Sequence, residues 1–163
     1  METVSSTEVP QENSDKFTAG ATVVYPDSSF CVEAVEGSNY LWQYLLRKDG
    51  SRYGGQRFYW LHNFSNSVVR KGGMAFDAAG YLWVLTDIGV QVCDQNGRVR
   101  GIFALPVELA TELVDSSENK LKDIRLEITD GELLFISPSA TYRRKLGVKA
   151  AVPGVTPVSE GAG

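Results

Sequence analysis

Three aspartates, Asp77, Asp87 and Asp94, lie close together in the sequence and are of a type that could hold a cation or transfer a proton. Each of them lies at the end of a predicted strand or in a turn, where an aspartate side chain accepts hydrogen bonds from the backbone. We therefore predict that they stabilise turns rather than form a carboxylate site. The same interpretation applies to three further aspartates, Asp27, Asp49 and Asp130.

The sequence shows no evident set of residues for nucleophilic catalysis. The single histidine, His62, follows an aromatic-rich run, and no nucleophile is placed to use it, so we predict a structural or surface role. The basic run at 143–145 lies on a predicted strand and is interpreted as the solvated outer edge of a sheet. Gly72 and Gly73 could admit a phosphate but lack the rest of a P-loop.

The two cysteines, Cys31 and Cys93, both lie within predicted strands. We predict that they are buried free thiols rather than a disulfide. No Cys/His pair has the spacing of a zinc site.

The overall charge excludes several classes of partner. A net charge of −4 and a pI near 5.0 argue against nucleic acid and against an anionic membrane surface. No apolar run is long enough to span a bilayer, and residues 1–16 lack the features of a secretory signal. We therefore expect no membrane partner, and the cytoplasm is the default compartment, with the localisation otherwise open.

The elements that would position these residues are short strands. Residues 72–106 contain four apolar runs separated by turn signals, including Asn96-Gly97, a dipeptide typical of hairpins. The pattern predicts one four-stranded antiparallel meander. By itself it fits a β-propeller blade and a generic small sheet equally well.

Similar units flank this one. Ala21, Gly73 and Asp123 begin three units at intervals of about 50 residues, a period typical of repeat architectures. The first unit has predicted strands at 21–25, 30–35, 40–46 and 57–61, with a loop over 48–55 before the last. The third has strands at 124–128, 133–136 and 141–146, and its fourth strand is missing or irregular. Residues 107–120 predict a short helix or polar loop.

The 163 residues fit one domain with two extensions. Residues 1–17 are polar and are predicted to be a disordered lead-in, because they cannot bury enough apolar surface. Residues 18–148 hold the three units. Residues 149–163, rich in proline and glycine, are predicted to be a flexible tail.

The central unit resembles a known family. Met74-Ala75-Phe76-Asp77, Gly80 and the run at 81–99 are similar to a blade of the SMP-30/gluconolactonase family. Residues 40–62 resemble the outer strands of the preceding blade, and residues 142–149 the close of the last one. The resemblance covers about residues 20–150. It implies an all-β fold of antiparallel four-stranded blades, about three of them, forming the C-terminal half of a six-bladed propeller.

The resemblance also implies metal-dependent hydrolysis of sugar lactones, but the residues that would carry it differ. The family motif is Pro-Asp-Gly-Met, in which the aspartate is similar to a metal ligand and general base, and Gly72 stands in its place here. Ala19 stands where the family has a second ligand, an asparagine. A third, a glutamate, would lie in blades that this chain lacks. Since a hard cation needs oxygen ligands and hydrolysis needs a base, we expect no catalytic or metal-binding residue here and a degenerate site.

Three residues, Lys71, Gly73 and Asp123, are expected to face a ligand in the channel. We expect no cofactor, unless calcium, zinc or manganese binds a site completed from elsewhere by a second copy of the chain or by a missing N-terminal half. The alternatives are a gluconolactonase-like hydrolase in a completed ring and a non-catalytic propeller module that binds a sugar-like ligand or a partner. A third is an unrelated β-sandwich.

Overall fold

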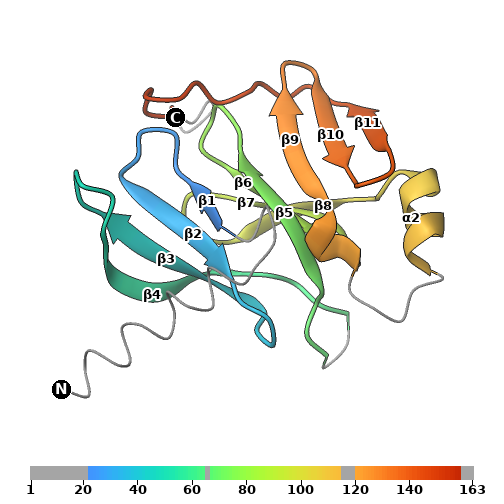
Figure 1. Ribbon diagram of the computed structural model, residues 1–163, viewed down its shortest axis with the longest axis horizontal. Coiled ribbons are helices and arrows are strands. Elements are labelled where there is room, and N and C mark those ends of the chain that lie inside the picture. The colour runs from blue at the N-terminus through green and yellow to red at the C-terminus, as the bar shows by residue number, and fades with distance from the viewer. Residues whose placement is uncertain (1–21, 65–66, 115–119, 159–163) are drawn as a thin grey trace.

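The computed structural model describes residues 22–64, 67–114 and 120–158, and this part of the chain folds into three antiparallel sheets (Figure 1). The first sheet contains β1 (Thr22–Val24), β2 (Phe30–Ala34), β3 (Tyr40–Leu46) and β4 (Arg52–Trp60). The second contains β5 (Lys71–Phe76), β6 (Leu82–Thr86), β7 (Gly89–Cys93) and β8 (Val99–Phe103). The third contains β9 (Arg125–Thr129), β10 (Glu132–Ile136) and β11 (Thr141–Lys145). The predicted all-β class is thus confirmed.

Neighbouring strands in each sheet follow one another in the chain, as expected for meanders joined by tight turns. At the predicted Asn96-Gly97 turn, Gly97 adopts a φ of 83°, which glycine tolerates because it has no Cβ. The turn places Cys93 opposite Val99 and so sets the register of β7 and β8. The predicted short helix is α2 (Val107–Val114), and the 3₁₀ helix η1 (Lys120–Asp123) precedes β9.

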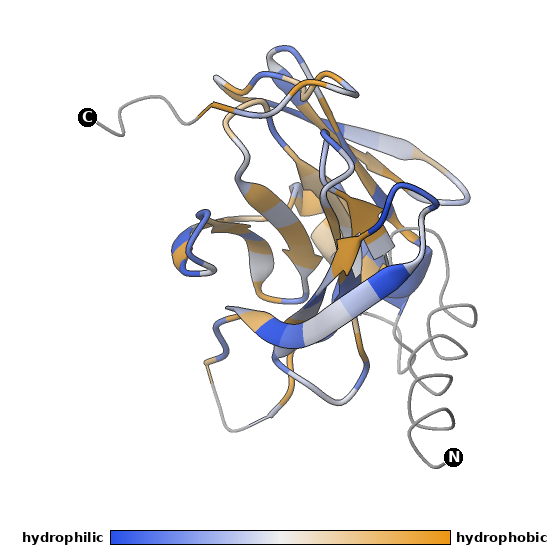
Figure 2. Cartoon of the chain, turned by 90° about the vertical axis from the view of Figure 1, so that its left-hand side faces the viewer, coloured by the Kyte–Doolittle hydropathy of each residue, from blue (hydrophilic) through white to orange (hydrophobic). Residues whose placement is uncertain are grey.

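The second sheet is the middle layer of the molecule. All residues of β6 and β7 are buried, so these strands are covered on both faces. Leu82, Val84 and Cys93 pack in a cluster with the first sheet, whereas Leu85 and Val90 pack in a second cluster with the third sheet and α2. Figure 2 shows that strand segments in the interior of the molecule are hydrophobic. Continuous rather than alternating hydrophobicity in β6 and β7 reflects this two-sided burial.

The first strands of the three sheets, β1, β5 and β9, lie next to one another, with β5 in the middle. Each is paired along one edge only within its own sheet. Gly73 allows β5 and β9 to approach closely, because a Cβ there would overlap the backbone nitrogen of Leu126. The Gly73 N–H donates to the Ile124 carbonyl over 2.9 Å. The six-bladed ring that the resemblance implies stays a prediction.

One predicted boundary was wrong and another was correct. The fourth strand of the first sheet begins at Arg52, and not at Arg57, so that Gly54 and Gly55 lie inside β4 and not in a loop. The Tyr44 ring lies against Gly55, where a Cβ would clash, and the β3–β4 register shifts nearby. Glycine here marks a close approach within an irregular strand pair, which a sequence does not distinguish from a loop. The third sheet has three described strands, as predicted.

The predicted lead-in at 1–17 lies outside the described residues, as do residues 159–163 of the predicted tail. Residues 149–158 contain no strand, but Ala150 forms an isolated bridge with Asp77. Among the described helices, none is long and apolar enough to cross a membrane.

Candidate functional site

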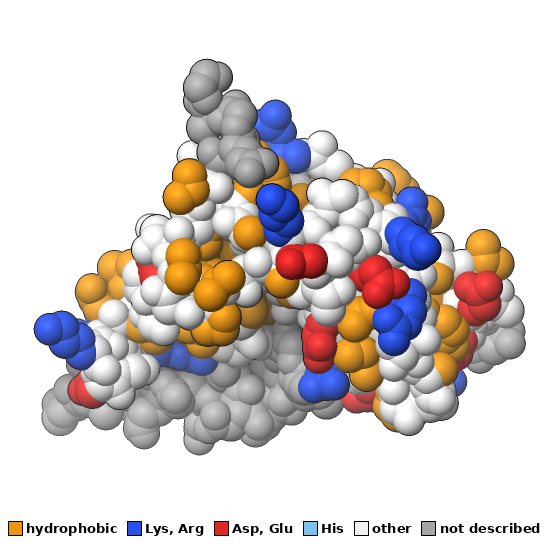
Figure 3. Space-filling model, turned by 90° about the horizontal axis from the view of Figure 1, so that it is seen from above, with side chains coloured by type: hydrophobic (Ala, Val, Ile, Leu, Met, Phe, Trp, Pro, Cys, Tyr) orange, Lys and Arg blue, Asp and Glu red, His pale blue; other side chains and the backbone are white. Residues whose placement is uncertain are grey.

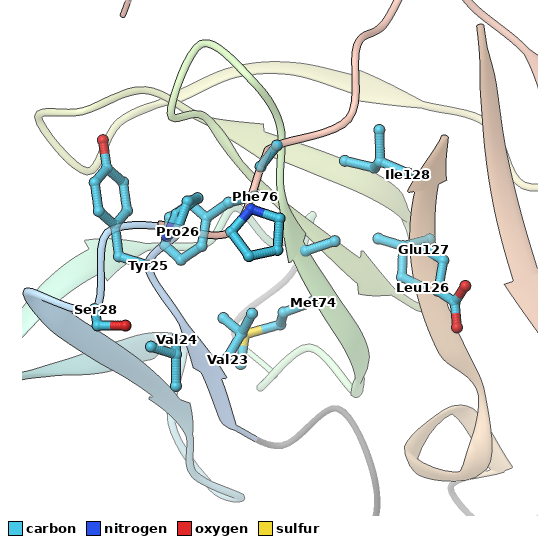
Figure 4. Close-up of a pocket in the computed structure, with 13 residues that line it drawn as sticks. Val23, Val24, Tyr25, Pro26, Ser28, Met74, Phe76, Leu126, Glu127 and Ile128 are labelled. Atoms are coloured by element: carbon cyan, nitrogen blue, oxygen red, sulfur yellow. The ribbon is translucent and has the colours of Figure 1, made fainter. Parts of the chain in front are cut away.

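A groove of about 480 Å³ lies where β1, β5 and β9 converge, and we call it the inner groove (Figure 4). The first strand of each of the three sheets contributes to its lining. Its lining is mostly aliphatic and aromatic, with Val23 and Val24 from β1, Met74 and Phe76 from β5, and Leu126 and Ile128 from β9.

Polar groups lie at the rim of the inner groove. Glu127 lines it, but its carboxylate points away from the side chains of β1 and β5 and pairs with Arg125 at 3.4 Å (Figure 4). Burial raises the pKa of the Tyr25 hydroxyl, with Asp27 and Asp77 adding to the effect, so this group stays neutral. The inner groove therefore offers an apolar surface with few hydrogen-bonding side chains.

Gly72, at the position of the expected metal ligand, does not open into this groove. It is buried against η1, and a Cβ would overlap the Leu121 carbonyl oxygen and approach Leu85 Cδ2 to 2.9 Å. An aspartate at this position would require η1 to move. Ala19 lies outside the described residues.

Lys71 is buried and points toward the first sheet. Its Nζ donates to the carbonyl oxygens of Ser38, at 2.5 Å, and Val69, at 3.2 Å. Burial lowers the pKa of this ammonium group, while the nearby Glu36 and Asp87 carboxylates oppose the effect. Lys71 therefore joins β5 to the β2–β3 turn and is not among the residues that line the inner groove.

Of the three residues expected to face a ligand, the structure brings two near each other. Gly73 is packed against β9 and hydrogen-bonded to Ile124, the residue after Asp123. Asp123 is exposed at the end of η1. Neither residue is among those that line the inner groove, and the Lys71 ammonium is directed toward the first sheet.

The predicted turn role of Asp77 and Asp94 is confirmed. Asp77 accepts hydrogen bonds from the backbone of Ala79 and Tyr81, each at 2.9 Å, and from Trp83 Nε1 at 2.8 Å. Asp94 accepts from the backbone of Asn96 at 2.8 Å and Arg98 at 3.1 Å, and from the Arg100 guanidinium at 3.3 Å. Burial raises the pKa of Asp94, but these hydrogen bonds outweigh it and the net shift is downward.

The remaining aspartates also bind backbone or turn groups. Asp27 and Asp49 accept from the backbone and hydroxyl of the serine two positions later. Asp87 accepts from the Arg70 backbone at 3.3 Å, and Asp130 from the Ala150 backbone at 2.9 Å. Asp27 and Asp49 thus stabilise their own turns, as predicted, whereas Asp87 and Asp130 connect their turns to distant segments of the chain.

Gln91 is a structural residue that sequence reasoning missed. It is fully buried in β7, and its side-chain amide pairs with the backbone of His62 as a neighbouring strand would. Its Oε1 accepts from His62 N–H at 2.7 Å, and its Nε2 donates to the His62 carbonyl at 2.9 Å. A polar residue inside the apolar run Val90–Val92 is the signal that could have found it. The His62 side chain itself is exposed, as expected for a surface residue.

The basic run and the cysteines follow prediction. Arg143 and Lys145 are exposed on β11, the edge strand of the third sheet, and Arg144 donates to the Ala104 carbonyl at 2.6 Å.

Cys31 and Cys93 are buried and free. Burial raises the pKa of both thiols, to about 12 for Cys93, so they remain protonated and unreactive.

A divalent cation does not fit the residues present. No group of three or more histidine, cysteine, aspartate or glutamate side chains in the described part of the chain is arranged to hold a metal ion. The inner groove is aliphatic, and Gly72 has no room for a carboxylate. Comparisons with known proteins add no assignment: no protein-family model matches the chain, and no curated protein matches it.

Proposed function

We propose that this chain is a gluconolactonase-like partial propeller that lacks the metal chemistry of that family and serves as a binding module. Its ligand, or the part of the ligand that it holds, is apolar and lies in the inner groove. The observation that carries this proposal is the aliphatic lining contributed by the first strand of all three sheets.

The size of the groove supports a binding role. Its volume of about 480 Å³ lies within the range of small-molecule sites, which are lined mainly by apolar side chains. Val24, one of the lining residues, is 50% exposed, so part of its apolar surface is accessible without rearrangement of the core. The side chains that line the groove offer a sugar few polar partners, and this favours an apolar ligand over the sugar-like ligand expected from the resemblance.

The loss of lactone hydrolysis is supported by the surroundings of β5. Lactone hydrolysis of the family type requires a cation that polarises the carbonyl and a base that activates water. Gly72 supplies no carboxylate, and the Lys71 ammonium binds two backbone carbonyls. No described group in the inner groove stands ready as general base.

The binding role is tested with 8-anilinonaphthalene-1-sulfonate as an apolar probe. Val24→Lys places a charge in the inner groove and should weaken probe binding several-fold. Val107→Lys is the matched control, because Val107 is a 76% exposed valine on α2, outside the groove. Equal probe binding by the two variants would contradict the proposed site.

The catalytic part is tested by calorimetric titration with calcium, zinc and manganese, and by hydrolysis of gluconolactone with and without each ion. We expect no saturable metal binding and no hydrolysis above the uncatalysed rate, with a known gluconolactonase assayed in parallel as positive control. Stoichiometric metal binding accompanied by hydrolysis would support the enzyme alternative instead.

A further inference from the structure

The C-terminal segment crosses one end of the inner groove. After β11 it runs along the upper side of the molecule from the third sheet toward the β1–β2 turn (Figure 1). Ala151 and Pro153 line the groove, whereas Val152 and Val155 are 58% and 54% exposed. On this side, shown in Figure 3, exposed hydrophobic groups lie beside intermingled acidic and basic groups. We call residues 149–156 the strap.

The strap binds all three sheets through hydrogen bonds. The Ala150 N–H donates to Asp130 Oδ1 at 2.9 Å in the β9–β10 turn. The Lys149 carbonyl accepts from Ala78 N–H at 2.9 Å in the β5–β6 turn. In the β1–β2 turn, the Gly154 N–H donates to the Pro26 carbonyl at 2.7 Å, and Thr156 Oγ1 donates to Asp27 Oδ2 at 3.0 Å.

These contacts reach the same turn in every sheet, the one that joins its first strand to its second. Each of the three turns contains an aspartate, namely Asp27, Asp77 or Asp130. The strap therefore hydrogen-bonds to the equivalent turn of each sheet and connects these three turns to one another. Hydrogen bonds to the equivalent turn in all three sheets are not expected for a segment that only lies on the surface.

The β1–β2 turn also carries local strain. Ser28 has a φ of 65°, and it is the one non-glycine residue with positive φ in the described part of the chain. Such a conformation persists where surrounding contacts hold it. Asp27 supplies these contacts, since it binds Ser29 on one side and Thr156 of the strap on the other.

We propose that the strap is a clamp that closes one end of the inner groove and fixes the first sheet relative to the other two. In a closed propeller the first and last blades hold each other, and here the strap supplies a connection between the first and third sheets. Ligands then reach the groove from the side that the strap leaves uncovered, where the lining residues Val24 and Glu127 are exposed. This inference deepens the proposed function, because it assigns the closed and open ends of that site.

The first experiment measures hydrogen exchange after removal of residues 151–163, which leaves the strap contacts to the second and third sheets. We expect exchange of the Ser28 N–H, which donates to the Tyr25 carbonyl, to accelerate roughly tenfold, the factor that corresponds to about one hydrogen bond. The Gly97 N–H in the β7–β8 turn is the internal reference and should not change. Removal of residues 159–163 alone is the control truncation.

A point variant keeps the inference testable if the truncated chain does not fold. Thr156→Val removes the hydroxyl that binds Asp27 and should also accelerate exchange at Ser28. Thr111→Val is its match, because Thr111 loses a hydroxyl bond of 2.9 Å to Val107 within α2. Equal exchange at Ser28 in the two threonine variants would overturn the clamp.

Closure of the groove is tested by thiol labelling of Ala75→Cys, a groove position with no reactive cysteine near it. The labelling rate of this cysteine should be several-fold lower in the full chain than in the chain that lacks residues 151–163. Equal labelling rates in the two chains would overturn the proposed closure. Neither readout involves metal, lactone or the apolar probe. Metal-dependent hydrolysis together with the expected exchange would therefore reject the proposed function and leave the clamp intact.

Discussion

Single aspartates determine the shape of the turns in this protein. Asp94 is the best example, because its carboxylate accepts two backbone hydrogen bonds within its turn and a third from the Arg100 guanidinium on β8. The same residue type would serve a metal or a proton transfer, but here its oxygens are used by backbone N–H groups. Two glycines contribute through the absence of a side chain. Because Gly72 and Gly73 have no Cβ, η1 and β9 can pack directly against the backbone of β5.

Asp94 should make stability depend on pH. Its pKa is lower in the folded chain than the ordinary value of about 4, so its stabilisation is present above that pH and is lost as the pH falls through the folded pKa. Asp94→Asn should therefore cost about 1 kcal/mol at pH 7 and less near pH 3. Denaturant unfolding at both pH values measures this, with the exposed Asp123→Asn as control. A cost that grows on acidification would contradict the argument.

Gly72 should not tolerate a side chain. Gly72→Ala is expected to lower the free energy of unfolding by about 1–3 kcal/mol, because its Cβ would overlap the Leu121 carbonyl. Gly147→Ala, where nothing lies near the new Cβ, should change it by less than about 0.5 kcal/mol. Gly72→Asp should likewise destabilise the protein rather than create a metal site. Gain of calcium binding by this variant would show that η1 moves aside.

At the scale of the elements, sheets are joined by side chains that replace missing strand partners. Gln91 of β7 pairs with the backbone of His62, two residues beyond the end of β4. Lys71 of β5 similarly binds the β2–β3 turn. These connections fix the angle between the first and second sheets, where apolar packing alone would permit sliding.

Replacement of Gln91 should reveal this connection. Gln91→Leu keeps the volume but leaves the His62 N–H and carbonyl without the amide that binds them, and should cost about 2 kcal/mol in unfolding free energy. Gln56→Leu, at an exposed position of β4, is the control and should change little. Similar denaturation midpoints for both variants would show that water replaces the amide.

For the whole molecule, the three sheets share two apolar clusters, and the second sheet belongs to both. This arrangement stabilises three consecutive sheets without ring closure, and the strap adds a connection between the outer two. The structure thus accounts for a stable inner groove within one chain. It carries no evidence for the expected homodimer or N-terminal half, which stay predictions.

Molecular mass in solution tests whether metal completes a ring. Because the inner groove holds no cluster of metal ligands, we expect light scattering to give the same mass with calcium, zinc, manganese or a chelator. A mass that rises from 17.9 kDa to about twice that value only with metal would contradict a metal-independent module. It would favour a site shared between two copies.

Much of the fold follows from local sequence patterns. Turn residues such as Asn96-Gly97 and Asp130-Gly131, together with short apolar runs, predicted ten of the eleven described strands to within a few residues. The same patterns did not predict where β4 begins. Gly54 and Gly55 predict a loop, but glycines also occur inside irregular strands such as β4. The turn roles of Asp77 and Asp94 were predicted for the same reason, because their hydrogen bonds reach only two to six residues along the chain.

The sequence by itself thus determined the all-β class, the turns and the absence of a carboxylate at position 72, which are all local properties. The tertiary structure alone decided that Gly72 is covered by η1, that Lys71 points toward the first sheet, and that residues 149–156 cross the inner groove. These features depend on contacts between residues far apart in the chain, such as Asp27 and Thr156, which are 129 positions apart. Strand periodicity and turn chemistry say nothing about such contacts, because they arise only when packed sheets bring distant turns to the same end of the molecule.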